Sequence, residues 1–135
     1  MRLFIDCEWN EYKGDLISMA LVSEDGREWY EVFYCHDPKD WIKANVMPKL
    51  GKKPITFSEG HASLRNFLVQ FNKCTIIADW PEDIAHFCNF LIVGPGLRID
   101  TPRLTFEIHR VDSVSDNPHN ALADAKGLKK QICCV

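Results

Sequence analysis

The first part of the chain alternates apolar and turn-forming segments in a way typical of β-strands. Three segments are rich in β-branched, aromatic and other apolar residues: 2–8 (RLFIDCE), 15–23 (DLISMALVS) and 27–34 (REWYEVFY). The sequence EDG at 24–26 ends in an Asp-Gly step, which favours a tight turn between two strands. The pattern therefore predicts a three-stranded antiparallel meander.

Farther along the chain, the spacing of apolar residues becomes that of amphipathic helices. Two sets of residues recur at helical intervals: Leu64, Phe67, Leu68 and Phe71, then Ile84, Phe87, Cys88 and Leu91. The first set predicts a helix within 61–72, and the second predicts a helix that ends before the GPG sequence at 94–96. Additional helices are predicted at 40–46 and at 120–132.

Two short apolar runs, 75–78 and 97–100, predict further strands. A meander followed by alternating helices and strands is typical of an α/β protein with one mixed sheet. We expect five strands, in which parallel strands join the antiparallel meander and helices flank the sheet. No repeat, low-complexity tract or linker interrupts the chain, so residues 1–135 are expected to form a single domain.

Composition narrows the class of protein without defining it. Hydrophobic residues make up 46% of the chain, enough for a core, and the net charge is −3. This balance argues against a broad basic surface that grips duplex nucleic acid, but it allows an enzyme that holds a chain end through metal ions. No apolar run is long enough to span a bilayer, and Asp6 comes too early for a signal peptide. We therefore expect no membrane association and a cytoplasmic location.

The six cysteines stand at irregular spacings: Cys7, Cys35, Cys74, Cys88, Cys133 and Cys134. No C-x-x-C pair is present, which argues against zinc and thioredoxin-type sites. A zinc protein that uses Cys133 and Cys134 is a rival interpretation, but it lacks the usual ligand spacing. In a chain without a secretory signal, reduced cysteines are expected.

Two carboxylates end the first predicted strand. Asp6 and Glu8 are two residues apart, so their side chains share one face with Phe4, while Cys7 points to the other face. Two partly buried carboxylates repel each other, and a divalent cation between them would remove the conflict. The alternative is a strand end that frays into solvent. Because sites in open α/β sheets gather at the carboxyl ends of strands, the pair is a candidate metal site.

Two further acids follow the strand predicted at 75–78. Asp79 comes directly after it, but this residue also fits the N-cap of a helix, with Pro81 in the first turn and Glu82 at the third position. Asp83 lies at the edge of the apolar stripe of that helix, where compensation of the helix dipole is the alternative explanation. We favour Asp83 as a metal ligand, and Asp79 as the helix cap and an alternative or outer ligand.

The last predicted helix contributes Asp124, and the loop before it contributes His119. Asp124 falls on the flank of the buried stripe, where a carboxylate needs a partner: a shared cation, or else a hydrogen bond or an arginine. His119 stands in the loop, with Asn120 as a helix cap. Its ordinary pKa of about 6.5 suits a general base near neutrality, although a histidine in a loop is often only exposed.

Together these pieces resemble a known family. Residues 4–8 (FIDCE), Asp83 and residues 119–124 (HNALAD) are similar in order and spacing to the three motifs of the DEDDh 3′→5′ exonucleases. These enzymes include ribonuclease T, oligoribonuclease and the proofreading subunit of bacterial replicases. The small size and residues 41–50 (WIKANVMPKL) are most similar to the compact mycobacterial-type exoribonucleases. Many relatives have Asn at the position of Asp79.

The resemblance implies a ribonuclease H-like fold and a two-metal reaction. Asp6, Glu8, Asp83 and Asp124 would bind two Mg²⁺ or Mn²⁺ ions, with Asp6 between them, and His119 would be the general base. One ion would activate water, and the other, roughly 4 Å away, would stabilise the leaving 3′ oxygen. The implied substrate is single-stranded nucleic acid with a free 3′ end, with RNA favoured over DNA. The relatives also imply a homodimer.

Trp9, next to Glu8, is a candidate for stacking on the terminal base, with ordinary packing as the alternative. The rival to an enzyme is a nuclease-like module that binds nucleic acid or protein without catalysis. Such a module would not need the complete set of acids and the histidine.

Overall fold

The computed structural model describes residues 1–133, and its main sheet begins with the predicted meander. Strands β1 (Arg2–Trp9), β2 (Leu16–Ser23) and β3 (Glu28–Val32) pair in antiparallel fashion. The tight turn between β2 and β3 contains Gly26, whose φ of 95° is accessible to glycine at little cost. The hydrophobic pattern of the first 34 residues therefore predicted both the strands and their pairing.

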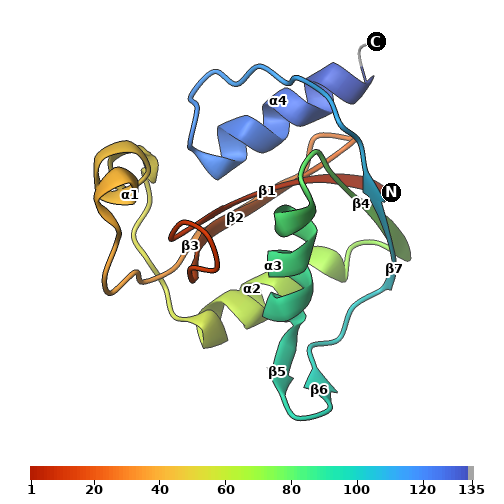
Figure 1. Cartoon of the computed structure of the whole chain (residues 1–135). Helices are drawn as coiled ribbons and strands as arrows, with labels where there is room; N and C mark the ends of the chain where they lie inside the picture. Colours follow the sequence, from red (N-terminus) through yellow and green to blue (C-terminus); the bar gives the residue numbers. More distant parts are fainter. Residues whose placement is uncertain (134–135) are drawn as a thin grey trace.

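Two parallel strands complete the five-stranded sheet, whose order is β3-β2-β1-β4-β7. Strand β4 (Lys73–Ala78) lies beside β1, and β7 (Arg103–Ile108) lies beside β4 (Figure 1). The mixed sheet and flanking helices confirm the predicted α/β architecture and are consistent with a ribonuclease H-like fold.

The prediction of a fifth sheet strand at 97–100 was wrong. Strand β6 (Leu97–Arg98) pairs with β5 (Ile92–Gly94) in a separate two-stranded hairpin. The GPG sequence forms its turn, with Gly96 at a φ of 68°. The true fifth strand is β7, which alternates polar and apolar residues and is exposed along most of its length. Its pattern therefore lacks the continuous apolar run of a buried strand.

The helices lie close to their predicted positions. They are α1 (Asp40–Asn45), the 3₁₀ turn η1 (Met47–Lys49), α2 (Phe57–Leu68), α3 (Pro81–Leu91) and α4 (Ala121–Cys133). Helix α2 starts earlier than predicted because Thr56 and Glu59 form a reciprocal capping box at its N-terminus, and it ends earlier, at Leu68. Within residues 1–133 no helix is both long and apolar enough to cross a membrane.

The helices cover the two faces of the sheet unequally (Figure 1). Helices α2 and α3 pack on the face that carries Leu3, Ile5 and Cys7 of β1. Helix α4 packs on the other face, over β1 and β2, through small residues such as Ala121 and Ala125. Phe4 points to this second face, as its spacing from Asp6 and Glu8 predicted. Both acids are thereby directed toward α4.

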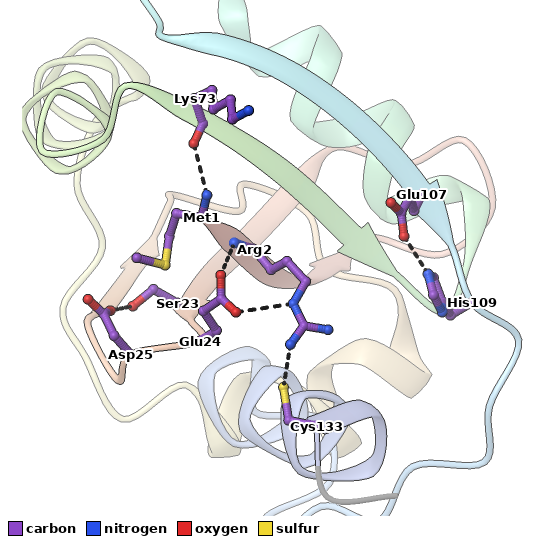
Figure 2. Close-up of polar contacts among 9 residues, drawn as sticks. All are labelled: Met1, Arg2, Ser23, Glu24, Asp25, Lys73, Glu107, His109 and Cys133. Atoms are coloured by element: carbon purple, nitrogen blue, oxygen red, sulfur yellow. Dashed lines mark hydrogen bonds and ion pairs between the residues drawn. The ribbon is translucent and has the colours of Figure 1, made fainter.

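Polar contacts hold the start of β1 in place (Figure 2). The amino group of Met1 donates to the carbonyl of Lys73, 3.2 Å away. Arg2 donates to Glu24 from its backbone N and its Nε, at 2.9 and 3.2 Å, and from Nη2 to Cys133 Sγ at 3.5 Å. These bonds link β1 to β4, to the β2–β3 turn and to the end of α4, so they support the register that places Asp6.

Candidate active site

The carboxyl ends of β1 and β4 bring two acids side by side. The strands are parallel, with Phe4 opposite Ile77. Two residues farther along the chain stand Asp6, within β1, and Asp79, the first residue after β4. Neighbouring parallel strands end at the same edge of a sheet, so this register delivers both carboxylates to one place, as the sequence predicted.

Five carboxylates converge at this edge and form two overlapping groups. The first group contains Asp6, Glu8 and Asp124, which offer oxygen atoms within 4.8 Å of one another. The second contains Asp6, Asp79 and Asp83, again within 4.8 Å. Asp6 belongs to both groups. The structure therefore brings together every acid that the sequence singled out, from β1, the end of β4, α3 and α4.

Asp83 is the most deeply buried of these acids, with 2% of its surface exposed. Its Oδ1 accepts a hydrogen bond from the backbone N of Cys7, at 2.9 Å. Helix α3 is thereby joined to β1 between Asp6 and Glu8. The position of Asp83 is thus set by a hydrogen bond to the strand, which is a stronger constraint than compensation of the helix dipole.

The prediction that Asp79 caps α3 was wrong. The N-cap residue is Trp80, in an extended conformation, and no side chain caps the helix. Pro81 occupies the first helical turn and disfavours a helical conformation at the residue before it, so the helix starts one residue later than a cap at Asp79 requires. The carboxylate of Asp79 instead belongs to the acidic group around Asp6.

The electrostatics of the cluster disfavour several negative charges at once. Burial, followed by repulsion from Asp83 and Glu8, raises the pKa of Asp6 well above its ordinary value. Burial and nearby acids raise the pKa of Glu8 to about 8. Burial also raises the pKa of Asp83 to about 8, even though the bond from Cys7 opposes the shift.

The oxygen atoms of the cluster fit divalent cations. Asp6 Oδ2 is shielded from solvent and has no hydrogen-bond partner within the protein. A buried, unpartnered carboxylate oxygen beside other carboxylates lacks the positive charge that would stabilise it. Mg²⁺ and Mn²⁺ prefer ligands of this hard, anionic oxygen type. The acidic groups could therefore hold a metal ion, and Asp6 is a member of both groups.

His119 stands beside the first acidic group, in the loop before α4. Its backbone N donates to Asp124 Oδ2 at 3.2 Å, and its φ of 71° is unusual for a residue other than glycine. Its ring meets the ring of Trp41 edge to face, with 5.1 Å between centroids. The loop histidine is thus next to the acids, as predicted.

The sequence did not predict the contacts that hold this loop. Asn120 caps α4 as expected, because its Oδ1 accepts from the backbone N of Ala123 at 3.0 Å. Its Nδ2 also donates to the carbonyl of Lys49 at 2.8 Å, and Lys49 Nζ donates to Asn117 at 3.3 Å. Residues 41–50 therefore support the His119 loop from the side, and only the family resemblance had singled them out.

Asn120→Ala is expected to destabilise the fold by about 1 kcal/mol, the usual cost of a lost N-cap. Asn120→Asp should retain most of that stability, since a carboxylate oxygen still caps the helix while the bond to Lys49 is lost. Chemical denaturation of the two variants measures the difference. Equal destabilisation by both would show that the link to Lys49, rather than the cap, is the important contact.

Trp9 already has a partner within the protein. Its ring lies 4.8 Å from that of His86, at an angle of 31°, and it is partly buried against the core. Beside this pair opens a cavity of about 540 Å³, lined by residues that include Leu16, Phe57, His61, His86 and Phe90. Two histidines, His61 and His86, thus line this cavity.

The cysteine-based rival gains no support in residues 1–133. The five cysteines in this range are free, and the groups that could hold a metal contain only carboxylates. Cys134, half of the proposed zinc pair, lies outside the described residues.

Fold and site together define the class: a ribonuclease H-like α/β protein with an acidic site at the carboxyl edge of its sheet. No family model matches the chain. Two proteins named 3′-5′ exoribonuclease, from strains CDC 1551 and H37Rv of Mycobacterium tuberculosis, are each 44% identical to it. Both alignments cover 93% of this chain and 88% of the relative. The chain therefore belongs to the mycobacterial-type 3′→5′ exoribonuclease family, and the DEDDh superfamily is consistent with this.

Proposed function

We propose that this protein is a metal-dependent 3′→5′ exoribonuclease that hydrolyses terminal phosphodiester bonds of single-stranded RNA. The observation that carries the proposal is the convergence of five carboxylates, with Asp6 common to both groups. The relatives named 3′-5′ exoribonuclease supply the polarity and the RNA substrate.

The acidic residues would hold two Mg²⁺ or Mn²⁺ ions. Glu8 and Asp124 would complete one site with Asp6, and Asp83 would complete the other, with Asp79 as an alternative or outer ligand. When bound, such ions activate water and stabilise a leaving oxygen. They also remove the repulsion that raises the pKa values of Asp6, Glu8 and Asp83. The acidic residues of this chain would hold the ions at the carboxyl edge of the sheet.

His119 would be the general base that takes a proton from the attacking water. Its backbone is bonded to Asp124, which belongs to the first acidic group, so the loop stays next to the place of reaction. One side of its ring faces Trp41. Histidine is the side chain that most often takes a proton in general base catalysis near neutrality.

The cavity beside Trp9 and His86 would accommodate bases near the 3′ end. Its walls include the aromatic rings of Phe57 and Phe90, which suit stacking with bases of any sequence. None of the five clustered acids lines this cavity, but His86 belongs to the same helix as Asp83, three residues farther along. Trp9 would form part of this stacking surface together with His86.

Degradation of matched strands tests the proposal. A 5′-labelled single-stranded RNA should shorten stepwise from its 3′ end with Mg²⁺, and EDTA should stop the reaction. The same strand with a blocked 3′ end should persist, and a DNA strand of equal sequence should be shortened more slowly. Failure to shorten any strand with Mg²⁺ or Mn²⁺ would refute the proposal and favour the alternative, a nuclease-like module that binds nucleic acid or protein without catalysis.

Without metal, the raised pKa values of the acidic cluster should make the free energy of unfolding depend on pH. The pKa of Glu8 and Asp83 rises to about 8 in the fold, from 4.5 and 3.8. The folded protein favours the protonated form of each group. The contribution of each group to the free energy of unfolding is therefore full below the pKa that the group has in the unfolded chain, and it is lost as pH rises through about 8. Asp83→Asn keeps an oxygen for the Cys7 bond but cannot ionise. In EDTA, its advantage in free energy of unfolding over the native protein should therefore grow by a few kcal/mol between pH 4 and pH 8.

Thermal and denaturant unfolding across this pH range measures the difference in free energy of unfolding between Asp83→Asn and the native protein. Mg²⁺ should reduce this difference, because it stabilises the native protein. A difference between the two proteins that stays constant with pH would contradict the raised pKa of Asp83.

Location and assembly complete the proposal. The five described cysteines are free, which suits the reducing cytoplasm. We also propose a homodimer in solution, on the pattern implied by the family resemblance.

A further inference from the structure

Strand β7 forms one edge of the main sheet, and no residue in 1–133 pairs with its outer side. Five of its six residues are exposed. The opposite edge, β3, is protected: Ile55 N donates to the carbonyl of Val32 at 2.8 Å, and Lys52 Nζ donates to that of Tyr30 at 2.6 Å. Figure 1 shows β7 along the margin of the molecule. An open edge with apolar side chains is a template for pairing with another strand.

The two faces of β7 differ in chemistry. Arg103, Thr105 and Glu107 share one face, and Thr105 bonds to Thr75 of β4 at 2.8 Å. The other face carries Leu104, Phe106 and Ile108. Phe106 contacts Phe87 with 6.0 Å between ring centroids, yet 39% of it stays exposed, as does 48% of Ile108. A partner strand would need to match a charged face and an apolar face at once.

The backbone of β7 determines which groups are free. His109 N donates to the carbonyl of Ala78 at 2.8 Å, just after the strand. Successive residues of a strand direct their N–H and C=O groups to opposite sides, so odd-numbered residues face β4. The N–H and C=O groups of Leu104 and Phe106 therefore face outward and are available to a second strand.

We propose that β7 pairs antiparallel with β7 of a second copy of this chain, with the two-fold axis at Thr105. This register places Arg103 of each copy opposite Glu107 of the other, on the charged face of the two β7 strands. It places Leu104 opposite Phe106 on the apolar face, where the two residues exchange backbone hydrogen bonds. Thr105 then faces its own equivalent in a pair without hydrogen bonds.

The charged residues of β7 favour this register over registers shifted along the strand. Moving the axis to Phe106 would place Arg103 opposite His109 and Glu107 opposite Thr105, so neither charge would meet its opposite. Within one chain, Glu107 Oε1 already accepts from His109 at 2.6 Å (Figure 2). Its Oε2 remains for Arg103 of the second copy. Cross-strand pairs of opposite charge stabilise a sheet, whereas like charges oppose it.

The rest of the fold permits the pairing. Helix α4 packs on β1 and β2, so it leaves the charged face of β7 uncovered. Two sheets would join into one of ten strands, with the acidic sites at opposite edges because the paired strands run in opposite directions. Each site would remain open to RNA. The inference rests on the proposed homodimer but not on the proposed catalysis, and it specifies the interface.

A cysteine at the axis tests the register directly. In the otherwise native chain, Thr105→Cys should give a disulfide-linked dimer under mild oxidation, because residues facing each other without hydrogen bonds lie close enough for a disulfide. Arg103→Cys is the matched control, since its own equivalent would lie about 13 Å away along the strand. Mass spectrometry of the non-reduced protein should locate the bond at position 105, apart from the natural cysteines.

Charge reversal gives a second, independent test. Arg103→Glu and Glu107→Arg should each raise the dimer dissociation constant at least tenfold in analytical ultracentrifugation, and the double reversal should restore it. Neither residue belongs to the acidic site, so RNA shortening at saturating substrate should stay unchanged. A protein that is monomeric at high micromolar concentration would overturn the homodimer and the interface together. A dimer that is linked equally by both cysteine variants, or is indifferent to charge reversal, would overturn the interface alone.

Discussion

Asp6→Asn is expected to abolish RNA shortening, with a loss of at least a thousandfold in turnover, or about 4 kcal/mol in the activation barrier. Asp6 is the one acid common to both carboxylate groups, so its replacement weakens both metal sites at once. An amide keeps the shape of the side chain but lacks the negative charge that a divalent cation requires. Single-turnover assays with labelled RNA, at Mg²⁺ concentrations up to saturation, measure the loss.

The same variant should separate activity from folding. Asp6 Oδ2 is a buried atom without a partner, and the pKa of Asp6 is raised by burial and by its acidic neighbours. Removing that charge should therefore make the metal-free protein more stable at pH 8, while Mn²⁺ titration shows weaker binding. Asp112→Asn is a suitable control, since this exposed carboxylate lies outside the cluster and its loss should change neither quantity. Metal binding of native strength by Asp6→Asn would contradict the shared role of Asp6.

The sequence predicted the acids of β1 because strand periodicity determines which side chains share a face. Asp6 and Glu8 had to point the same way as Phe4, and the structure directs all three toward α4. The end of β4 was predictable for a similar reason, because parallel strands end at one edge of the sheet. Strand periodicity and one rule of sheet topology were thus sufficient to predict where Asp6, Glu8 and Asp79 lie.

The middle of the site shows where such local rules compete. Asp79 and Glu82 have the spacing of a capping box, and that pattern favoured Asp79 as a helix cap. The proline at the first helical position moved the cap to Trp80 and left Asp79 to the acidic cluster. Asp83 is positioned by a bond from Cys7, which is 76 residues earlier. A contact across that separation has no signal in a single sequence.

Strand β7 and the support of the His119 loop escaped prediction for a related reason. An exposed edge strand has no buried face to impose a clear pattern, so the short apolar run at 97–100 was chosen in its place. The loop is held by Lys49 through bonds to Asn117 and Asn120, about 70 residues away in sequence. Only the packed structure brings these residues together.

Replacement of His119 should reduce turnover strongly while leaving the metal sites nearly intact. A positioned general base contributes about 10²–10⁴-fold to rate, so a loss in this range is expected. Because His119 has a φ of 71°, His119→Ala would also strain the loop, whereas His119→Asn tolerates that conformation. Both variants should lose the rate, and His119→Asn should keep native stability and native affinity for Mn²⁺.

This combination distinguishes a base from a structural residue. The neighbours of His119 are Trp41 and the carboxylate of Asp124, which accepts from its backbone N and not from its ring. Replacing the ring by an amide therefore leaves the bond to Asp124 in place, while it removes the group that accepts a proton together with the ring contact to Trp41. Full turnover of His119→Asn at pH 7 would exclude His119 as the base, and the acidic cluster would then have to activate water without it.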